Sequence, residues 1–196
     1  MSRRISAAAA LASACAIVGL VVPAHAVGTT AAPVRVLAPE PPVLCTPEQE
    51  DLGATDDKAK RDCHAKRALS VGLRAQFYED RAIEIRDPAS SEDARDLQDI
   101  REAVTTAQQA AEKAQTAEDA SLAASDAQAA AEAARLAADG LTRMTKASAT
   151  EDKLFNAADA AQDAAYNADG AGGRDVALNK AADVAEKATH DGITWS

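Results

Sequence analysis

The chain has 196 residues, of which 31 are acidic and 21 basic, so its net charge is −10, and only 3% of its residues are aromatic. An acidic surface repels nucleic acids and anionic lipids, so we expect neither as a direct partner. Catalytic acids need a pocket with apolar walls. Such a pocket is hard to build with so few aromatic side chains, so we expect no catalytic activity.

The first 26 residues have the three parts of a secretory signal peptide. Arg3 and Arg4 supply the positive end, an uncharged apolar stretch covers Ile5–Val22, and Ala24-His25-Ala26 is a small-x-small cleavage site. We expect cleavage after Ala26, an extracellular or cell-envelope location, and no stable membrane insertion afterwards. An uncleaved anchor is the alternative, although the stretch is slightly short for a bilayer span of about 20 residues. Cleavage removes two basic residues and no acidic ones, so the net charge falls from −10 to −12.

Residues 27–44 form a proline-rich segment. They contain four of the seven prolines, Pro33, Pro39, Pro41 and Pro42. Small residues and proline cannot build a core, so this segment is predicted to be a disordered, flexible linker. The helical domain is expected to cover residues 45–196.

Two cysteines remain after signal cleavage, Cys45 and Cys63. In an oxidising compartment such a pair indicates one disulfide. A single helix over residues 47–63 would separate them by roughly 24 Å, whereas a disulfide needs Cα atoms about 4.4–6.8 Å apart. The chain is therefore predicted to turn at Gly53, between helices over residues 47–52 and 56–86. A Cys63–His64 nucleophile is disfavoured because adjacent helical residues do not face one another.

The helix over residues 56–86 holds most of the large apolar side chains. Leu69, Leu73 and Phe77 follow one another at four-residue steps, which is typical of a buried helix face. The strongest part of the core is expected close to the disulfide, at Leu69, Leu73, Phe77, Ile85, Leu97, Ile100 and Val104.

An alanine-rich stretch follows, in which 17 of the 36 residues from Ala103 to Ala138 are alanine. Alanine is the best helix former, and its small side chain lets helices approach closely. The pattern predicts one long helix over residues 91–139 with a coiled-coil-like seam of methyl groups. The seam changes register near Ala117–Ala120, as at a stammer. Burial of this seam needs the other helices or a second copy of the chain.

Two further helices are predicted, over residues 149–168 and 175–189, with the glycine-rich turn 169–173 between them. Ser148 and Glu151 form a capping-box pattern before the first. The second offers an apolar set of Val176, Ala177, Ala181, Val184 and Ala188. With no alternating strand pattern, the fold class is all-α: an alanine-rich antiparallel helical bundle, coiled-coil-like, with a disordered N-terminal segment.

No motif for catalysis, cofactor binding or metal binding is present. The histidines after the signal peptide, His64 and His190, are far apart and lack metal-ligand spacing. We expect no catalytic residue, no cofactor and no metal site.

These observations predict a secreted or envelope-associated structural or interaction protein that acts through helix faces, by self-association or on a protein partner. One alternative is a small-ligand binding module with a site between helices near Phe77 and Tyr78. Another is an enzyme of unrecognised type, in which His64 would be the residue to test.

Overall fold

Helices account for nearly all of the part of the chain that the structure, a computed structural model, describes: residues 44–193. Within that range there are six helices and no strand, so the all-α prediction is confirmed. The predicted signal peptide 1–26, the cleavage site after Ala26 and linker residues 27–43 lie outside the described residues.

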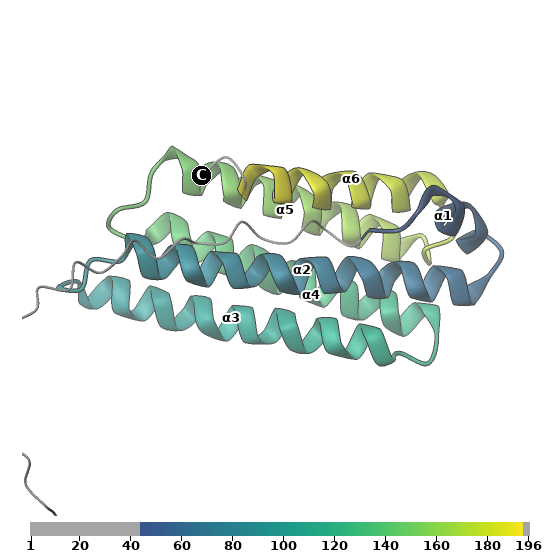
Figure 1. The fold of residues 1–196 in the computed structure, drawn as a ribbon, viewed down its shortest axis with the longest axis horizontal. Coiled ribbons are helices and arrows are strands. Elements are labelled where there is room, and N and C mark those ends of the chain that lie inside the picture. The colour runs from purple at the N-terminus through teal and green to yellow at the C-terminus, as the bar shows by residue number, and fades with distance from the viewer. Residues whose placement is uncertain (1–43, 194–196) are drawn as a thin grey trace, which may run out of the picture. The chain divides into compact units, whose positions relative to one another are not determined.

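The helices follow one another in chain order as α1 (Pro47–Gly53), α2 (Asp57–Ile85), α3 (Ser91–Thr116), α4 (Ala120–Arg143), α5 (Ala149–Gly170) and α6 (Val176–Ile193). The five longer helices lie side by side along one direction (Figure 1). Short connections make successive helices antiparallel, with α4 packed against α2, α3 and α5, and α6 packed against α5 and α2.

Polar side chains set where the first five helices begin. Each of these helices has an N-cap whose side chain accepts a backbone N–H of the first turn, namely Thr46, Asp56, Ser90, Asp119 and Ser148. Full capping boxes are present at Thr46–Gln49 and Ser148–Glu151, as their spacing predicts. Helix α1 ends at Gly53, where the sequence predicts the turn back towards Cys63.

The predicted single helix over residues 91–139 is wrong, because the chain reverses between Thr116 and Ala120. Ala117 has an extended backbone with ψ 136°, and the Asp119 side chain caps α4 by accepting the Leu122 N–H at 2.9 Å. The change of register near Ala117–Ala120 therefore marks a turn. As a result, the two halves of the methyl seam pack against each other within one chain.

Helix α4 is the central helix, and alanine is the reason. Twelve of its residues are buried, ten of them alanine. A helix with so broad an apolar face is stable only when other helices cover that face. Alanine side chains let α2, α3 and α5 approach α4 on three sides, and one cluster of buried residues includes members of all four helices.

The core differs from the prediction on one face of α2. Phe77, Ile85, Leu97, Ile100 and Val104 are buried as predicted. Leu69 and Leu73 are instead 37% and 39% exposed. The residues of α2 that enter the core lie on a neighbouring face, at Ala68, Val71, Ala75, Tyr78 and Ala82.

Helix α6 is oriented with its polar side inward, contrary to its sequence pattern. Most of the expected apolar face points to solvent, and Val184 is 70% exposed, with Ala177, Ala181 and Ala188 exposed as well. The buried residues are Asn179, Ala182, Asp183, Glu186, Thr189 and Ile193. Polar partners on α2 account for this orientation, and they are described below.

At the end of the bundle where α2 leads into α3 and α4 into α5, Asp93 joins two loops. Its carboxylate accepts the N–H of Asp87 at 2.7 Å and both the N–H and the hydroxyl of Thr145, at 2.9 and 2.6 Å. These hydrogen bonds, that of the Thr145 hydroxyl above all, lower the pKa of Asp93 to about 2. The α2–α3 and α4–α5 connections are thereby held together.

Gly140 lies within α4 at a close approach to Ile100 of α3. A Cβ at this position would lie 2.5 Å from Cγ1 of Ile100. For Gly140→Ala we expect a clash costing about 1–3 kcal/mol, more than the ~1 kcal/mol of helix propensity that alanine gains over glycine. Thermal unfolding should show a lower midpoint.

Gly170→Ala is the control, because a Cβ there meets nothing within 4 Å. Its midpoint should stay unchanged or rise. An unchanged or higher midpoint for Gly140→Ala would contradict the close approach of α4 and α3.

Candidate functional site

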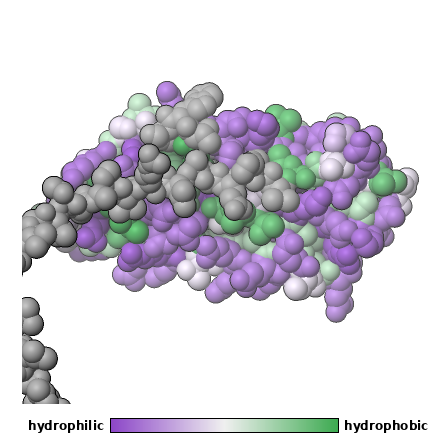
Figure 2. Space-filling model, in the orientation of Figure 1, coloured by the Kyte–Doolittle hydropathy of each residue, from purple (hydrophilic) through white to green (hydrophobic). Residues whose placement is uncertain are grey.

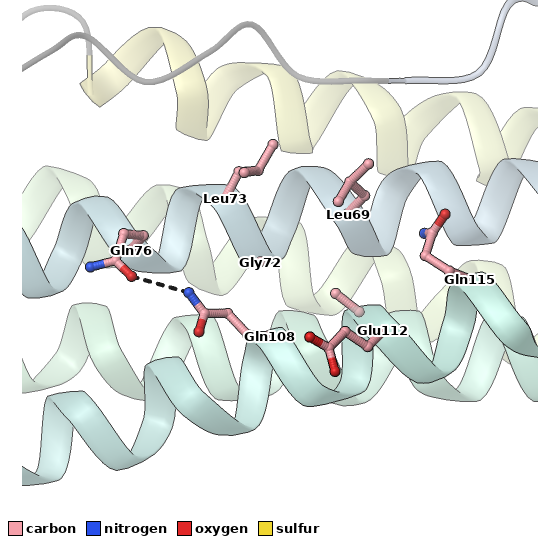
Figure 3. A pocket seen from close by; sticks show the side chains of 8 residues that line it. Leu69, Gly72, Leu73, Gln76, Gln108, Glu112 and Gln115 are labelled. Atoms are coloured by element: carbon pink, nitrogen blue, oxygen red, sulfur yellow. Dashed lines mark hydrogen bonds between the residues drawn. The ribbon is translucent and has the colours of Figure 1, made fainter.

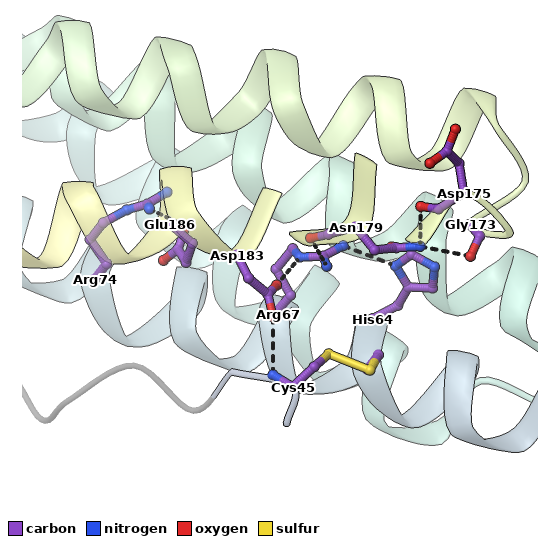
Figure 4. A network of polar contacts seen from close by, with 10 residues as sticks. Cys45, His64, Arg67, Arg74, Gly173, Asp175, Asn179, Asp183 and Glu186 are labelled. Carbon is purple, nitrogen blue, oxygen red and sulfur yellow. Dashed lines mark hydrogen bonds and ion pairs between the residues drawn. A yellow bond between two sulfur atoms is a disulfide. The ribbon is translucent and has the colours of Figure 1, made fainter. Parts of the chain in front are cut away.

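Polar and charged side chains are buried between α2 and α6, in what we call the polar layer. It consists of His64, Arg67 and Arg74 on α2, and of Asn179, Asp183, Glu186 and Thr189 on α6. Figure 4 labels all of these except Thr189. On α2, the basic residues Lys60, Arg67, Arg74 and Arg81 stand seven residues apart. This spacing puts them on one helix face, which is the face that meets α6 and the start of α5.

Arg67 is the centre of the polar layer and is only 2% exposed. Its Nε donates to Asp183 Oδ1 at 2.7 Å and its Nη2 to the backbone oxygen of Asn179 at 3.1 Å. Its Nη1 lies 3.3 Å from His64 Nδ1. Since arginine only donates, this imidazole nitrogen is the acceptor.

His64 is buried and uncharged. Desolvation first, and then the neighbouring Arg67 and Lys60, lower its pKa to about 3. Gly173, with φ +62°, passes so close that a Cβ there would lie 2.5 Å from His64 Nε2. The imidazole is therefore enclosed by backbone and by Arg67, and it is 1% exposed.

Arg74 and Glu186 form a second buried ion pair, in which Arg74 also donates to the Thr189 hydroxyl. Burial raises the pKa of Glu186, opposed by the attraction of Arg74. Burial likewise raises the pKa of Tyr78, which lies near this pair, to about 12. Within residues 44–193, Arg74 Nε and Nη2 and the Tyr78 hydroxyl make no hydrogen bond.

Helix α1 is fastened over one end of the polar layer. The Cα atoms of Cys45 and Cys63 are 5.1 Å apart and their sulfurs are joined in a disulfide. The Cys45 N–H donates to Asp183 Oδ2 at 3.1 Å. Desolvation, together with repulsion from Asp183, raises the pKa of the buried Glu50 on α1 to about 7.

A groove runs between α2 and α3 on another face of α2 (Figure 3). This α2–α3 groove has a volume of about 280 Å³ and is lined by Leu69, Gly72, Leu73, Gln76, Gln108, Ala111, Glu112 and Gln115. Gly72 and Ala111 keep its floor low, since a Cβ at Gly72 would lie 3.1 Å from that of Ala111. Gln108 donates to Gln76 across it at 3.1 Å.

The groove is apolar at its floor and amide-rich at its rim. Leu69 and Leu73 are the two half-exposed leucines of α2. On the face that Figure 2 shows, hydrophobic residues appear as separate patches within a largely hydrophilic surface. An apolar groove with a polar rim is typical of a binding surface.

The residues that the sequence analysis names lie in different parts of the bundle, except for the two cysteines. Cys45 and Cys63 meet, and His64 joins the polar layer. Phe77 and Tyr78 lie in the core, with ring centroids 6.2 Å apart, and neither lines the groove. His190 is at the other end of α6, 3.7 Å from Asp191.

Sequence reasoning missed the polar layer and the groove. The seven-residue spacing of Lys60, Arg67, Arg74 and Arg81 is a signal that could have identified the first. Within residues 44–193, no group of three or more His, Cys, Asp or Glu side chains could hold a metal ion. No helix in that range has the length and apolar character needed to cross a bilayer.

No protein-family model, no curated protein and no solved structure matches this chain.

The Arg74–Glu186 pair should behave as a buried ion pair whose members depend on each other. Arg74→Met alone leaves the Glu186 carboxyl buried without its partner, which typically costs about 3–5 kcal/mol. The double variant Arg74→Met/Glu186→Leu removes both members of the pair, so neither is left buried without its partner. We therefore expect most of the stability to return. Urea unfolding of the two single variants and the double variant measures this. A double variant as unstable as the sum of the single ones would contradict the pairing.

Glu50 should make stability depend on pH. The folded protein keeps the Glu50 proton up to about pH 7, whereas the ordinary pKa is 4.5. Its contribution is complete below pH 4.5 and is lost as the pH rises through 7. His64, with a pKa lowered from 6.5 to about 3, acts in the opposite sense, because stability falls as the pH drops below 6.5.

Comparison of the wild-type protein with Glu50→Gln isolates the Glu50 contribution, since His64 is common to both. Asp183, Lys180 and Arg67, the charged groups facing Glu50, are also unchanged. Between pH 4.5 and 7, the stability of wild type relative to the variant should fall by up to about 1.4 kcal/mol per pH unit. Urea unfolding at several pH values measures the difference. A difference independent of pH would refute the raised pKa.

Proposed function

We propose that this protein is an exported, non-catalytic interaction protein that binds an extended segment of a partner protein in the α2–α3 groove. The observation on which the proposal depends is the groove itself, with two half-exposed leucines on its wall and an amide rim. The signal-peptide pattern and the Cys45–Cys63 disulfide are compatible with an extracellular location.

The chemistry of the groove favours a peptide over a small ligand. Its volume of about 280 Å³ is just below the roughly 300–1,000 Å³ of typical small-molecule pockets. It runs beside about two turns of each helix, from Leu69 to Gln76 on α2 and from Gln108 to Gln115 on α3, so a short extended segment suits it. The glutamines at its rim can donate to and accept from peptide groups, while Leu69 and Leu73 contact apolar side chains.

The polar layer supports a structural role for the titratable groups. Arg67 and Arg74 are paired with Asp183 and Glu186. His64 is enclosed, and its pKa is far below neutrality. These groups determine which side of α6 faces α2, and this is a structural role.

The test uses the oxidised mature protein, beginning at Val27, as bait in the extracellular fluid of the producing organism. Leu69→Glu/Leu73→Glu puts two charges on the groove wall at half-exposed positions. Loss of two leucine contacts worth about 1.5–3 kcal/mol each should reduce capture of the partner at least tenfold. Quantitative mass spectrometry of the captured proteins gives the ratio.

Leu136→Glu is the matched control, because Leu136 is 49% exposed on α4 and does not line the groove. It should capture the partner as well as the wild type does. A partner retained by the groove variant, or lost equally in the control, would contradict a role for the groove.

A further inference from the structure

We propose that the α2–α3 groove selects a partner segment in which a lysine or arginine stands between two apolar residues, and that Glu112 binds the positive charge. The inference rests on the proposed function and names the chemistry of the partner. Three features of the groove carry it: its charge, the spacing of the leucines on its wall, and its length.

Glu112 gives the groove a negative charge. Of the eight residues that line the groove in the described part of the chain, one is charged, and it is Glu112. Figure 3 shows Glu112 on α3, across from Leu69 of α2. On a helix, the residues three and four positions away are the neighbours that could neutralise a carboxylate. For Glu112 none of them is charged: Gln108, Gln109, Gln115 and Thr116.

The basic residues closest to the groove in sequence point elsewhere. Lys66 of α2 donates to Gln49 of α1 at 2.6 Å. Lys113 follows Glu112 directly on α3, and adjacent helical residues do not face one another. Helix α3 ends at Thr116, so the negative end of its dipole adds to the attraction for a cation. A lysine or arginine of a partner can therefore make a charge-assisted hydrogen bond with Glu112.

The two leucines of the wall determine the spacing of apolar residues in the segment. Leu69 and Leu73 are four residues apart on α2, which is about 6 Å at ~1.5 Å per residue. In an extended segment, alternate residues point the same way and are about 6.6 Å apart, while the residue between them points the opposite way. When the backbone rests on the low floor at Gly72 and Ala111, that opposite side is α3, with Glu112. The matching order is apolar, basic, apolar.

Hydrogen bonds between α2 and α3 bound the groove at both ends. Gln108 donates to Gln76 at one end, and Gln115 donates to the backbone oxygen of Ala65 at the other. Ala65 and Gln76 are eleven residues apart on α2, or about 16 Å. This leaves room for about five extended residues at ~3.3 Å each. The apolar–basic–apolar triplet with one residue on either side fills that length.

Charge also favours a basic partner over a second copy of this chain. Each copy has a net charge of −10, so two copies repel each other, whereas a positively charged segment is attracted. Complementary charge of this kind contributes more to specificity than to affinity. We therefore expect Glu112 to determine which segment binds, with the leucine contacts supplying most of the affinity.

The test titrates the oxidised mature protein, labelled with nitrogen-15, with two end-blocked peptides at low ionic strength. Gly-Leu-Arg-Leu-Gly has the proposed order, and Gly-Leu-Glu-Leu-Gly has an acidic residue in place of the basic one. Chemical shifts of the Gly72 and Ala111 amides report binding at the groove floor. We expect the arginine peptide to bind about threefold more tightly, as for a partly exposed ion pair. The preference should fade as salt is added.

Three variants assign this preference to one carboxylate. Glu112→Lys should reverse it, to about threefold in favour of the glutamate peptide. Glu112→Gln, which keeps the shape of the side chain, should abolish it. Glu132→Lys is the matched control, because Glu132 is exposed on α4 and does not line the groove. It changes the net charge by the same amount as Glu112→Lys and should leave the preference as it is in the wild type.

Four results would overturn the proposal. They are equal affinity of the wild type for the two peptides, a preference that survives Glu112→Lys, a preference that Glu132→Lys reverses as well, and the absence of shifts at Gly72 and Ala111 with either peptide at millimolar concentration. Sedimentation of the protein alone tests the other occupant. A dimer that Leu69→Glu/Leu73→Glu dissociates would mean that a second copy fills the groove, and it would also overturn the proposal.

The charge preference and the partner-binding role can fail separately. If the peptides are discriminated through Glu112 but Leu69→Glu/Leu73→Glu leaves capture of the partner intact, the proposed function is wrong and the preference of the groove remains. If capture depends on the two leucines but the peptides bind equally, the preference is wrong and the proposed function remains.

Discussion

The packing of methyl groups around α4 is the contact on which the rest of the bundle depends. Each alanine contributes little, about 0.8 kcal/mol for a buried methyl, but α4 offers ten buried alanines to three neighbouring helices. Close approach on three sides needs small side chains throughout, and Gly140 takes this to its limit against Ile100. With α4 packed between them, the backbones of α2 and α5 do not approach each other closely, and α6 lies against both helices, above the long side chains of α2.

Those long side chains determine which face of α6 is buried. Two arginines in the interior are costly without partners, and Asp183 and Glu186 supply them. Once these pairs are made, the apolar side of α6, with Val184, has to face solvent. An ion pair replaced by apolar residues of similar size often leaves a protein as stable as before. We therefore conclude that the polar layer mainly determines which face of α6 packs on α2 and in which register, and contributes less to the free energy of folding.

Much of the fold follows from local signals. Capping residues such as Thr46 and Ser148 mark where helices begin, and a disulfide between Cys45 and Cys63 requires the turn at Gly53. The break between α3 and α4 was missed because alanine suits a continuous helix and a hairpin equally. The orientation of α6 was missed because its apolar pattern was considered alone, whereas the arginines of α2 require the acidic face of α6 as their partner. The groove depends on which face of α2 meets α3, a property of packing that no local pattern encodes.

The disulfide also determines how the molecule would respond to pulling. Cys45 and Cys63 are 18 residues apart along the chain, and the whole of α1 lies between them. A force applied through the residues before Leu44 would enter α2 directly at Cys63, through a covalent bond. Helix α1 would then be a side branch under no tension, and the mechanical resistance of the protein would be that of α2 leaving the bundle.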